Sequence, residues 1–142
     1  MRSDRLQRLI ELKERLMEEK ERLLERYFRE KDNIVSNIEV LDNEGEKNYH
    51  DLCTKCLEGN EFTSIRDYIE HLGRLKISAL TAKHNLEKQI AAVRHELYEM
   101  LKEIKVLNTL KEKIVASDRR AENKKHQKLI DEIALRLDST KT

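Results

Sequence analysis

The sequence predicts an all-α protein, a long antiparallel coiled-coil hairpin made of two helices. Its 142 residues include no proline, three glycines and 4% aromatic residues, which is too little turn-forming and strand-forming material for a sandwich, a barrel or a doubly wound sheet. Charged residues make up 40% of the chain, yet the formal net charge is only +1. Because so polar a chain cannot fill a round core, its apolar residues must lie along a seam. We expect one structural unit over residues 1–142.

The first helix is expected over about residues 4–57. Its apolar residues fall mostly three or four positions apart, as one face of a helix requires. They are Leu6, Leu9, Ile10, Leu16, Met17, Leu23, Leu24, Tyr27, Ile34, Ile38, Leu41 and Leu52. Lys13, Lys20 and Lys31 interrupt this pattern. We therefore expect a seam that is wider and more polar than that of an ordinary coiled coil.

The second helix, expected over about residues 64–137, has the clearest repeat. Every seventh residue from Ile65 to Ala121 is apolar, through nine positions. Between Leu86 and Ile114, apolar residues four positions further on form a 4-3 repeat, with Lys111 as its one polar position. A spacing of 3.5 residues keeps one stripe facing a partner helix and produces a left-handed coiled coil.

The chain is expected to reverse direction at residues 58–64. Gly59 can adopt the left-handed conformation that ends a helix, and Ser64 with Asp67 forms an S-x-x-D capping box. Antiparallel pairing about this turn places Ile34 opposite about Lys88. A competing turn lies at residues 42–48, which contain no apolar side chain, but we expect a local kink there rather than a reversal.

The second helix outlasts the first by about 30 Å at 1.5 Å per residue, which leaves residues 117–137 without a partner helix. This segment carries Arg119, Arg120, Lys124, Lys125 and Lys128, followed by Ile130, Ile133 and Leu137. A basic stretch that leads into an apolar stripe is typical of a helix that docks on an acidic protein surface. The alternative is a solvated tail. Nucleic acid is a weaker candidate, because acidic residues are interleaved with the cations and no aromatic residue accompanies them.

The sequence also argues against a membrane protein, a secreted protein and an enzyme. The longest apolar run, Ile90 to Val93, is far too short to cross a bilayer, and the first residues lack the apolar stretch of a signal peptide. We expect a cytoplasmic protein without direct membrane insertion. A two-helix hairpin offers no interior cavity in which a catalytic group could be desolvated, so we expect neither enzyme activity nor a cofactor.

Four potential zinc ligands lie near one end of the expected hairpin, namely His50, Cys53, Cys56 and His71. The first three are spaced by three residues, so on a helix they fan over some 120° of the surface, a poor geometry for one tetrahedral ion. We therefore expect no metal, and we interpret Cys53 and Cys56 as small apolar helix residues.

Four short motifs resemble the FliJ family of the flagellar type III export apparatus, which is related in role to the YscO-type stalks of injectisomes. They are Leu6-x-x-Leu9-x-x-Leu12, Tyr68-Ile69-x-x-Leu72, Val93-Arg94-x-x-Leu97 and the tail Glu122-x-x-x-x-Gln127-Lys128-x-x-Asp131-Glu132-Ile133-Ala134. The resemblance extends over nearly the whole chain.

The resemblance implies a hairpin similar to the two-helix stalk of the rotary ATPase γ subunit, standing in the central opening of the hexameric flagellar export ATPase. It also implies contacts with the cytoplasmic ring of the export gate and with empty export chaperones, and a location at the inner face of the cell membrane. The gate-facing residues would be Ile38, Leu41, Tyr68, Leu72 and Leu75. The ATPase-facing end would be the basic and apolar segment described above. The alternative is a generic coiled-coil scaffold or chaperone that acts through homodimerisation.

Overall fold

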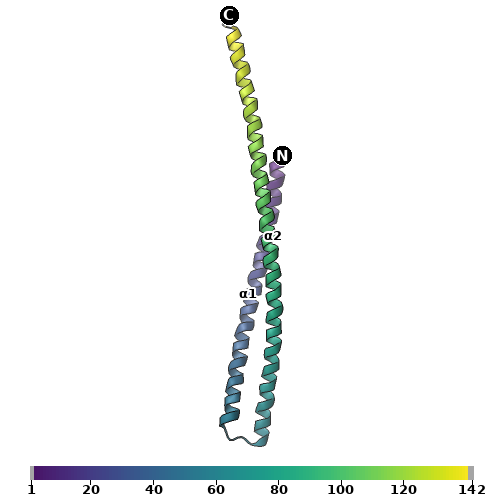
Figure 1. The fold of residues 1–142 in the computed structure, drawn as a ribbon, viewed down its shortest axis with the longest axis vertical. Coiled ribbons are helices and arrows are strands. Elements are labelled where there is room, and N and C mark those ends of the chain that lie inside the picture. The colour runs from purple at the N-terminus through teal and green to yellow at the C-terminus, as the bar shows by residue number, and fades with distance from the viewer. Residues whose placement is uncertain (1, 141–142) are drawn as a thin grey trace. The chain divides into compact units, whose positions relative to one another are not determined.

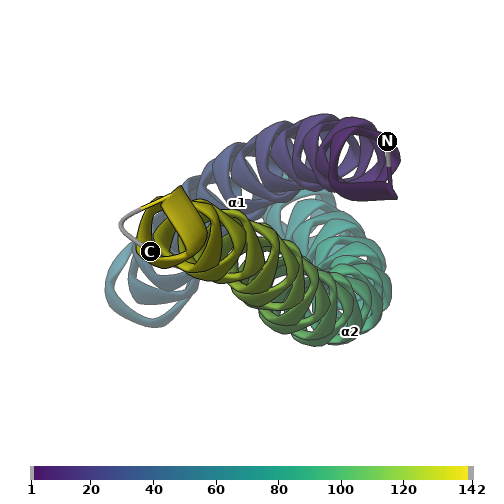
Figure 2. The ribbon, with the colours of Figure 1, turned by 90° about the horizontal axis from the view of Figure 1, so that it is seen from above.

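The computed structural model describes residues 2–140, which form two helices and one short loop. Helix α1 spans Arg2–Thr54, with 53 residues, and helix α2 spans Gly59–Thr140, with 82 residues. The two run alongside each other in opposite directions (Figure 1), and each is continuous when seen from above (Figure 2). No described residue belongs to a strand, so the expected all-α hairpin is confirmed. The expected unit, 1–142, includes Met1, Lys141 and Thr142, which lie outside the described residues.

The chain reverses at residues 55–58, earlier than the expected 58–64. The carbonyl of Asp51 accepts the last α1 bond from the Lys55 N–H at 3.1 Å, and that of Glu58 accepts the first α2 bond from the Phe62 N–H at 3.0 Å. Gly59 is the first residue of α2 and no described glycine has a positive φ, so Gly59 is not a left-handed helix end.

The proposed capping box at Ser64 also differs from the structure, because Ser64 lies inside α2. Nothing in residues 59–64 stops a helix, and Glu61 in the first turn interacts favourably with the positive end of the helix dipole. Residues 42–48 are helical as well, so the competing turn does not form.

The contacts divide the chain into two compact units, which are described separately. Unit 2 comprises Glu19–Leu97, and its core is formed by Leu72, Leu86, Ile90 and Val93, each at most 6% exposed. Unit 1 comprises Met1–Glu18 with Tyr98–Thr142, and its buried residues are Ile10 and Ile104. Every buried residue of α2 lies on the stripe that the heptad repeat predicts.

Four lysines in the seam are paired with acidic residues of the opposite helix, and a fifth is bonded to a glutamine. In unit 2, Nζ to carboxylate oxygen distances are 2.8 Å for Lys20–Glu96, 3.5 Å for Lys31–Glu87 and 2.7 Å for Lys76–Asp42. In unit 1, Lys13 contacts Glu103 at 2.6 Å and Lys111 donates a hydrogen bond to Gln7. A lysine stem can cover apolar neighbours while its charged end reaches the rim, which explains how these residues fit the seam.

The ion pairs also fix the antiparallel register. The expected register would have placed Glu87 opposite about Val35, whereas Glu87 contacts Lys31. The difference follows from the earlier position of the turn, because moving the turn slides one helix along the other.

Candidate docking surfaces

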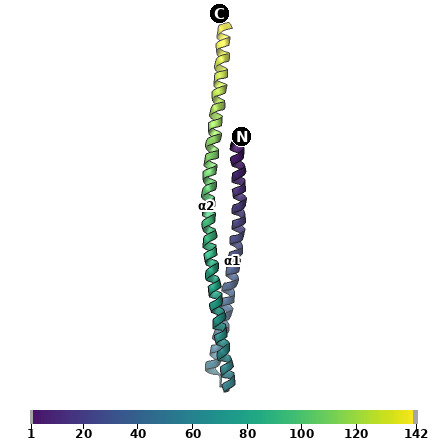
Figure 3. The same ribbon diagram turned by 90° about the vertical axis from the view of Figure 1, so that its right-hand side faces the viewer.

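The terminal segment, residues 117–139 of α2, lies beside the beginning of α1 in unit 1 and continues past it. Arg2 shares a shallow surface hollow with α2 residues from Ile114 to Lys125. Beyond that hollow, α2 extends past the end of α1 without a neighbouring helix (Figure 3). Every residue of the terminal segment is exposed.

Four apolar side chains of the terminal segment lie on one side of the helix. Leu129, Ile130, Ile133 and Leu137 are 48–59% exposed, and at 3.6 residues per turn they fall within a stripe about 100° wide. Leu135, 70% exposed, lies on the opposite side. Leu129 was not among the predicted docking residues, although its helical spacing from Ile133 would have identified it.

The five predicted basic residues of the terminal segment make no ion pair within the described part of the hairpin. Within residues 2–140, no ion pair involves Arg119, Arg120, Lys124, Lys125 or Lys128. The structure therefore places exposed cations and an exposed apolar stripe on the same helical segment.

A second candidate surface lies toward the turn in unit 2, where the structure separates the predicted residues into two groups. Tyr68 and Leu75 are exposed, at 40% and 42%, and can contact a partner. Ile38 and Leu41 are half-buried, and Leu72 is 5% exposed. The side chain of Leu72 is buried in the seam, so it cannot contact a partner while the two helices are paired.

Tyr68 connects the two helices of unit 2 at this surface. Its hydroxyl donates a hydrogen bond to Oε2 of Glu44 at 3.1 Å. The bond holds the proton on the phenol and raises the pKa of Tyr68 above its ordinary value of 10.0, with burial adding to the effect. The aromatic ring is thus held in place and still accessible.

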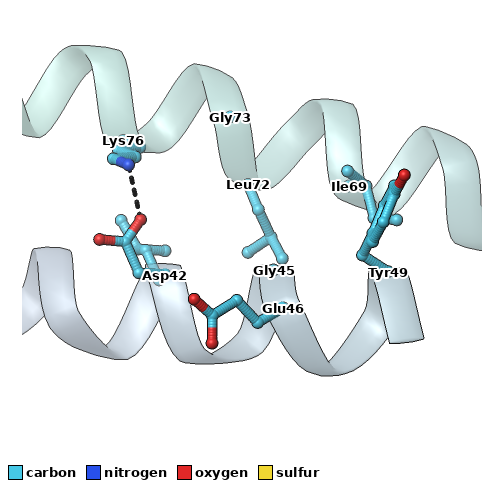
Figure 4. A pocket seen from close by; sticks show the side chains of 9 residues that line it. Asp42, Gly45, Glu46, Tyr49, Ile69, Leu72, Gly73 and Lys76 are labelled. Atoms are coloured by element: carbon cyan, nitrogen blue, oxygen red, sulfur yellow. Dashed lines mark ion pairs between the residues drawn. The ribbon is translucent and has the colours of Figure 1, made fainter. Parts of the chain in front are cut away.

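A shallow groove of about 340 Å³ lies between α1 and α2 in the same half of unit 2. Figure 4 shows Gly45 facing Leu72 across the groove, with Tyr49 beside Ile69 toward one end and the Lys76–Asp42 ion pair toward the other. Leu41, Glu46 and Gly73 complete its lining. Sequence analysis did not identify this groove, because it depends on which residues of the two helices lie opposite one another.

The cysteine and histidine residues near the turn do not converge. Cys53 and Cys56 are free and exposed. Among the described residues, no three His, Cys, Asp or Glu side chains are grouped so that they could hold a metal ion. A search of the same residues for a helix long and apolar enough to cross a membrane also found none.

Comparison with models of protein families shows which family this hairpin resembles. A model of the flagellar FliJ protein family matches residues 1–141. The chain belongs to this family. The match extends over essentially the whole chain, which confirms the resemblance seen in the sequence motifs and makes this a protein of flagellar type III export. Comparisons with curated proteins and with solved structures found no match.

Proposed function

We propose that this FliJ family member is a non-enzymatic central stalk of the flagellar type III export apparatus. In this role its terminal segment binds the hexameric export ATPase, and the half of unit 2 near the turn binds the cytoplasmic ring of the export gate. It works in the cytoplasm, held at the inner face of the membrane by the apparatus, and it also escorts empty export chaperones. It binds no nucleic acid.

The observation that carries the ATPase assignment is the exposed terminal segment. Burying a side chain of the size of isoleucine or leucine contributes roughly 1.5–3 kcal/mol, so exposure of Ile130 and Ile133 leaves binding free energy for a partner. The unpaired cations next to them favour an acidic partner and speed its approach. The central opening of an ATPase ring with acidic inner surfaces would accept both features.

Transmission between the two ends relies on the continuity of α2, which is helical from Gly59 to Thr140. A continuous helix passes on a displacement that a flexible linker would absorb. The stalk performs no chemistry itself but links nucleotide hydrolysis in the ring to the gate.

The test is a binding measurement with the purified export ATPase from the same organism. Ile130→Ser combined with Ile133→Ser should weaken binding at least tenfold and reduce stimulation of ATPase assembly. Leu135→Ser is the control, because it removes an exposed leucine from the opposite side of the same segment. Binding that the double substitution leaves unchanged, or that the control weakens equally, would contradict the assignment of this stripe to the ATPase.

A second pair of variants separates the apolar contribution from the charged one. Arg119→Glu with Arg120→Glu should slow association and reduce its salt dependence, since these cations act at long range. Asp131→Ala with Glu132→Ala should not slow association. A rate that does not depend on salt in the native protein would contradict the role given to the cations.

A further inference from the structure

Two glycines line the groove in unit 2, and neither is required by the hairpin. Gly45 lies inside α1 and Gly73 inside α2. A glycine within a helix costs roughly 0.5–1 kcal/mol relative to alanine. No described glycine has a positive φ, and a Cβ added at either position would meet no atom within 4 Å. Backbone conformation and helix contact therefore do not explain these residues.

What the two glycines do is keep the groove open. Both belong to its lining, together with the apolar side chains of Leu41, Tyr49, Ile69 and Leu72. In Figure 4, Gly45 lies opposite Leu72 and adds no side chain of its own there, and the side chain of Glu46 projects beside it. A longer residue at position 45 or 73 would project into this space. The hairpin gives up stability to preserve a hollow with apolar walls.

The charge around the groove indicates what enters it. The charged residues that line the groove are Asp42, Glu46 and Lys76, and Lys76 is already paired with Asp42. Glu46 also lines the groove, and within residues 2–140 no ion pair involves it. Among the charged residues that line the groove, the one without an ion pair is therefore negative, which favours a basic partner.

We propose that this groove is a docking site for a basic segment of a partner protein. The segment inserts one large apolar side chain between Gly45 and Gly73, and a lysine or arginine next to it pairs with Glu46. The inference rests on the proposed function only in taking this half of unit 2 as a docking surface, and it adds the chemistry that the partner must have.

The chain offers a clean measurement because it contains only three glycines. In the ¹⁵N-labelled full chain, the backbone amides of Gly45 and Gly73 report on the groove and that of Gly59, at the start of α2, is an internal control. The probe is a lysine-rich helical peptide with a single central phenylalanine. A second peptide, with glutamate in place of every lysine, tests the role of charge.

Addition of the lysine peptide should shift the Gly45 and Gly73 amide signals and leave Gly59 unchanged, and the glutamate peptide should bind at least tenfold more weakly. Gly45→Leu should abolish the shift at Gly73, whereas Ser78→Leu, which places the same side chain on an exposed part of α2, should not. Glu46→Gln should weaken binding several-fold. Leucine favours helix more than glycine does, so circular dichroism should show that Gly45→Leu remains folded.

The proposal is overturned if both peptides shift the glycine signals equally, if neither does, or if Gly45→Leu binds as the native chain does. Shifts of Gly45 and Gly73 that appear on concentrating the chain alone would also overturn it, because they would make a second copy the occupant. The proposed binding to the export gate is tested by other variants, so it can fail independently of the groove site. Loss of gate-ring binding in Tyr68→Ser or Leu75→Ser, with peptide binding intact, leaves the groove site standing, and native gate binding in both variants would contradict the proposed gate surface.

Discussion

Lys20 of α1 and Glu96 of α2 face each other across the helices of unit 2, with 2.8 Å between the lysine Nζ and a carboxylate oxygen. The lysine occupies a position that the heptad pattern reserves for an apolar residue. Polar groups at such positions generally fix register and partner choice at a cost in stability. We infer that Lys20, with Lys31, selects the fold-back within one chain over other pairings of the same helices.

Substitution of Lys20 by leucine should therefore raise the thermal midpoint of unfolding and at the same time increase self-association. The gain is expected because an apolar side chain that can pack in the seam replaces a lysine whose side chain is 39% exposed, and the self-association is expected because the polar residue that specifies the register is lost. Sedimentation equilibrium and thermal unfolding measure the two effects. A variant that is both less stable and strictly monomeric would contradict this role for Lys20.

The Lys20–Glu96 pair should also produce a specific pH dependence. The hydrogen bond to Glu96, and then its charge, raise the pKa of Lys20 above its ordinary value of 10.5. A lysine whose pKa is raised on folding stabilises the folded state fully below its unfolded pKa, and this contribution is lost as the pH rises through the folded value. The stability difference between the native protein and Glu96→Gln should thus be constant from pH 7 to 9 and shrink above about pH 10.5. A stability difference that persists unchanged at pH 12 would contradict this contribution of the Lys20–Glu96 pair.

Tyr68 should ionise at a higher pH than an ordinary tyrosine, because its hydroxyl donates a hydrogen bond to Glu44 and this bond raises its pKa. Absorbance at 295 nm during an alkaline titration measures the ionisation of the four tyrosines. Tyr68→Phe should remove a late-titrating component, and Glu44→Gln should move that component to lower pH. Tyr98→Phe is the control, and it should leave the late component in place.

Replacing Gly45 or Gly73 by alanine should stabilise the hairpin by roughly 0.5–1 kcal/mol each, since helix propensity improves and an added Cβ would meet no atom within 4 Å. Urea unfolding monitored by circular dichroism gives the free energy of unfolding. Destabilisation by either substitution would mean that the helices approach more closely at these positions than the structure shows.

Removal of the last part of the terminal segment, from Lys128 onward, should leave the rest of the hairpin nearly as stable as before. A chain that ends at Gln127 loses exposed side chains, which usually contribute less than about 0.5 kcal/mol each. Ile104→Ala is the contrasting variant, because Ile104 is 6% exposed in unit 1 and truncation of a buried isoleucine costs about 2–5 kcal/mol. If the shorter chain loses as much stability as Ile104→Ala, the terminal segment packs on the hairpin and is not free to dock.

The candidate sites were predictable from sequence to different degrees. The exposed cations and the Ile130–Ile133 stripe follow from charge counting and helical spacing, which are local properties. Whether Leu72 contacts a partner or the other helix was harder to predict. The family resemblance implies a gate-facing residue, whereas the heptad repeat implies a seam residue, and in the structure Leu72 is buried. The groove was missed because Gly45 and Gly73 lie 28 positions apart in the sequence and face the same space only in this register.

By itself, the sequence determined that the chain is helical, that α2 carries a seam of 3.5-residue period, and that the protein is a FliJ family member. These properties depend on neighbours within a few turns of one helix. Only the tertiary structure decided where the chain reverses, which residues face one another, and how the seam lysines find acidic partners. The reason is physical: each turn of a coiled coil resembles the next, so several registers bury similar apolar area, and the choice among them rests on a few contacts between distant residues, such as Lys31 with Glu87.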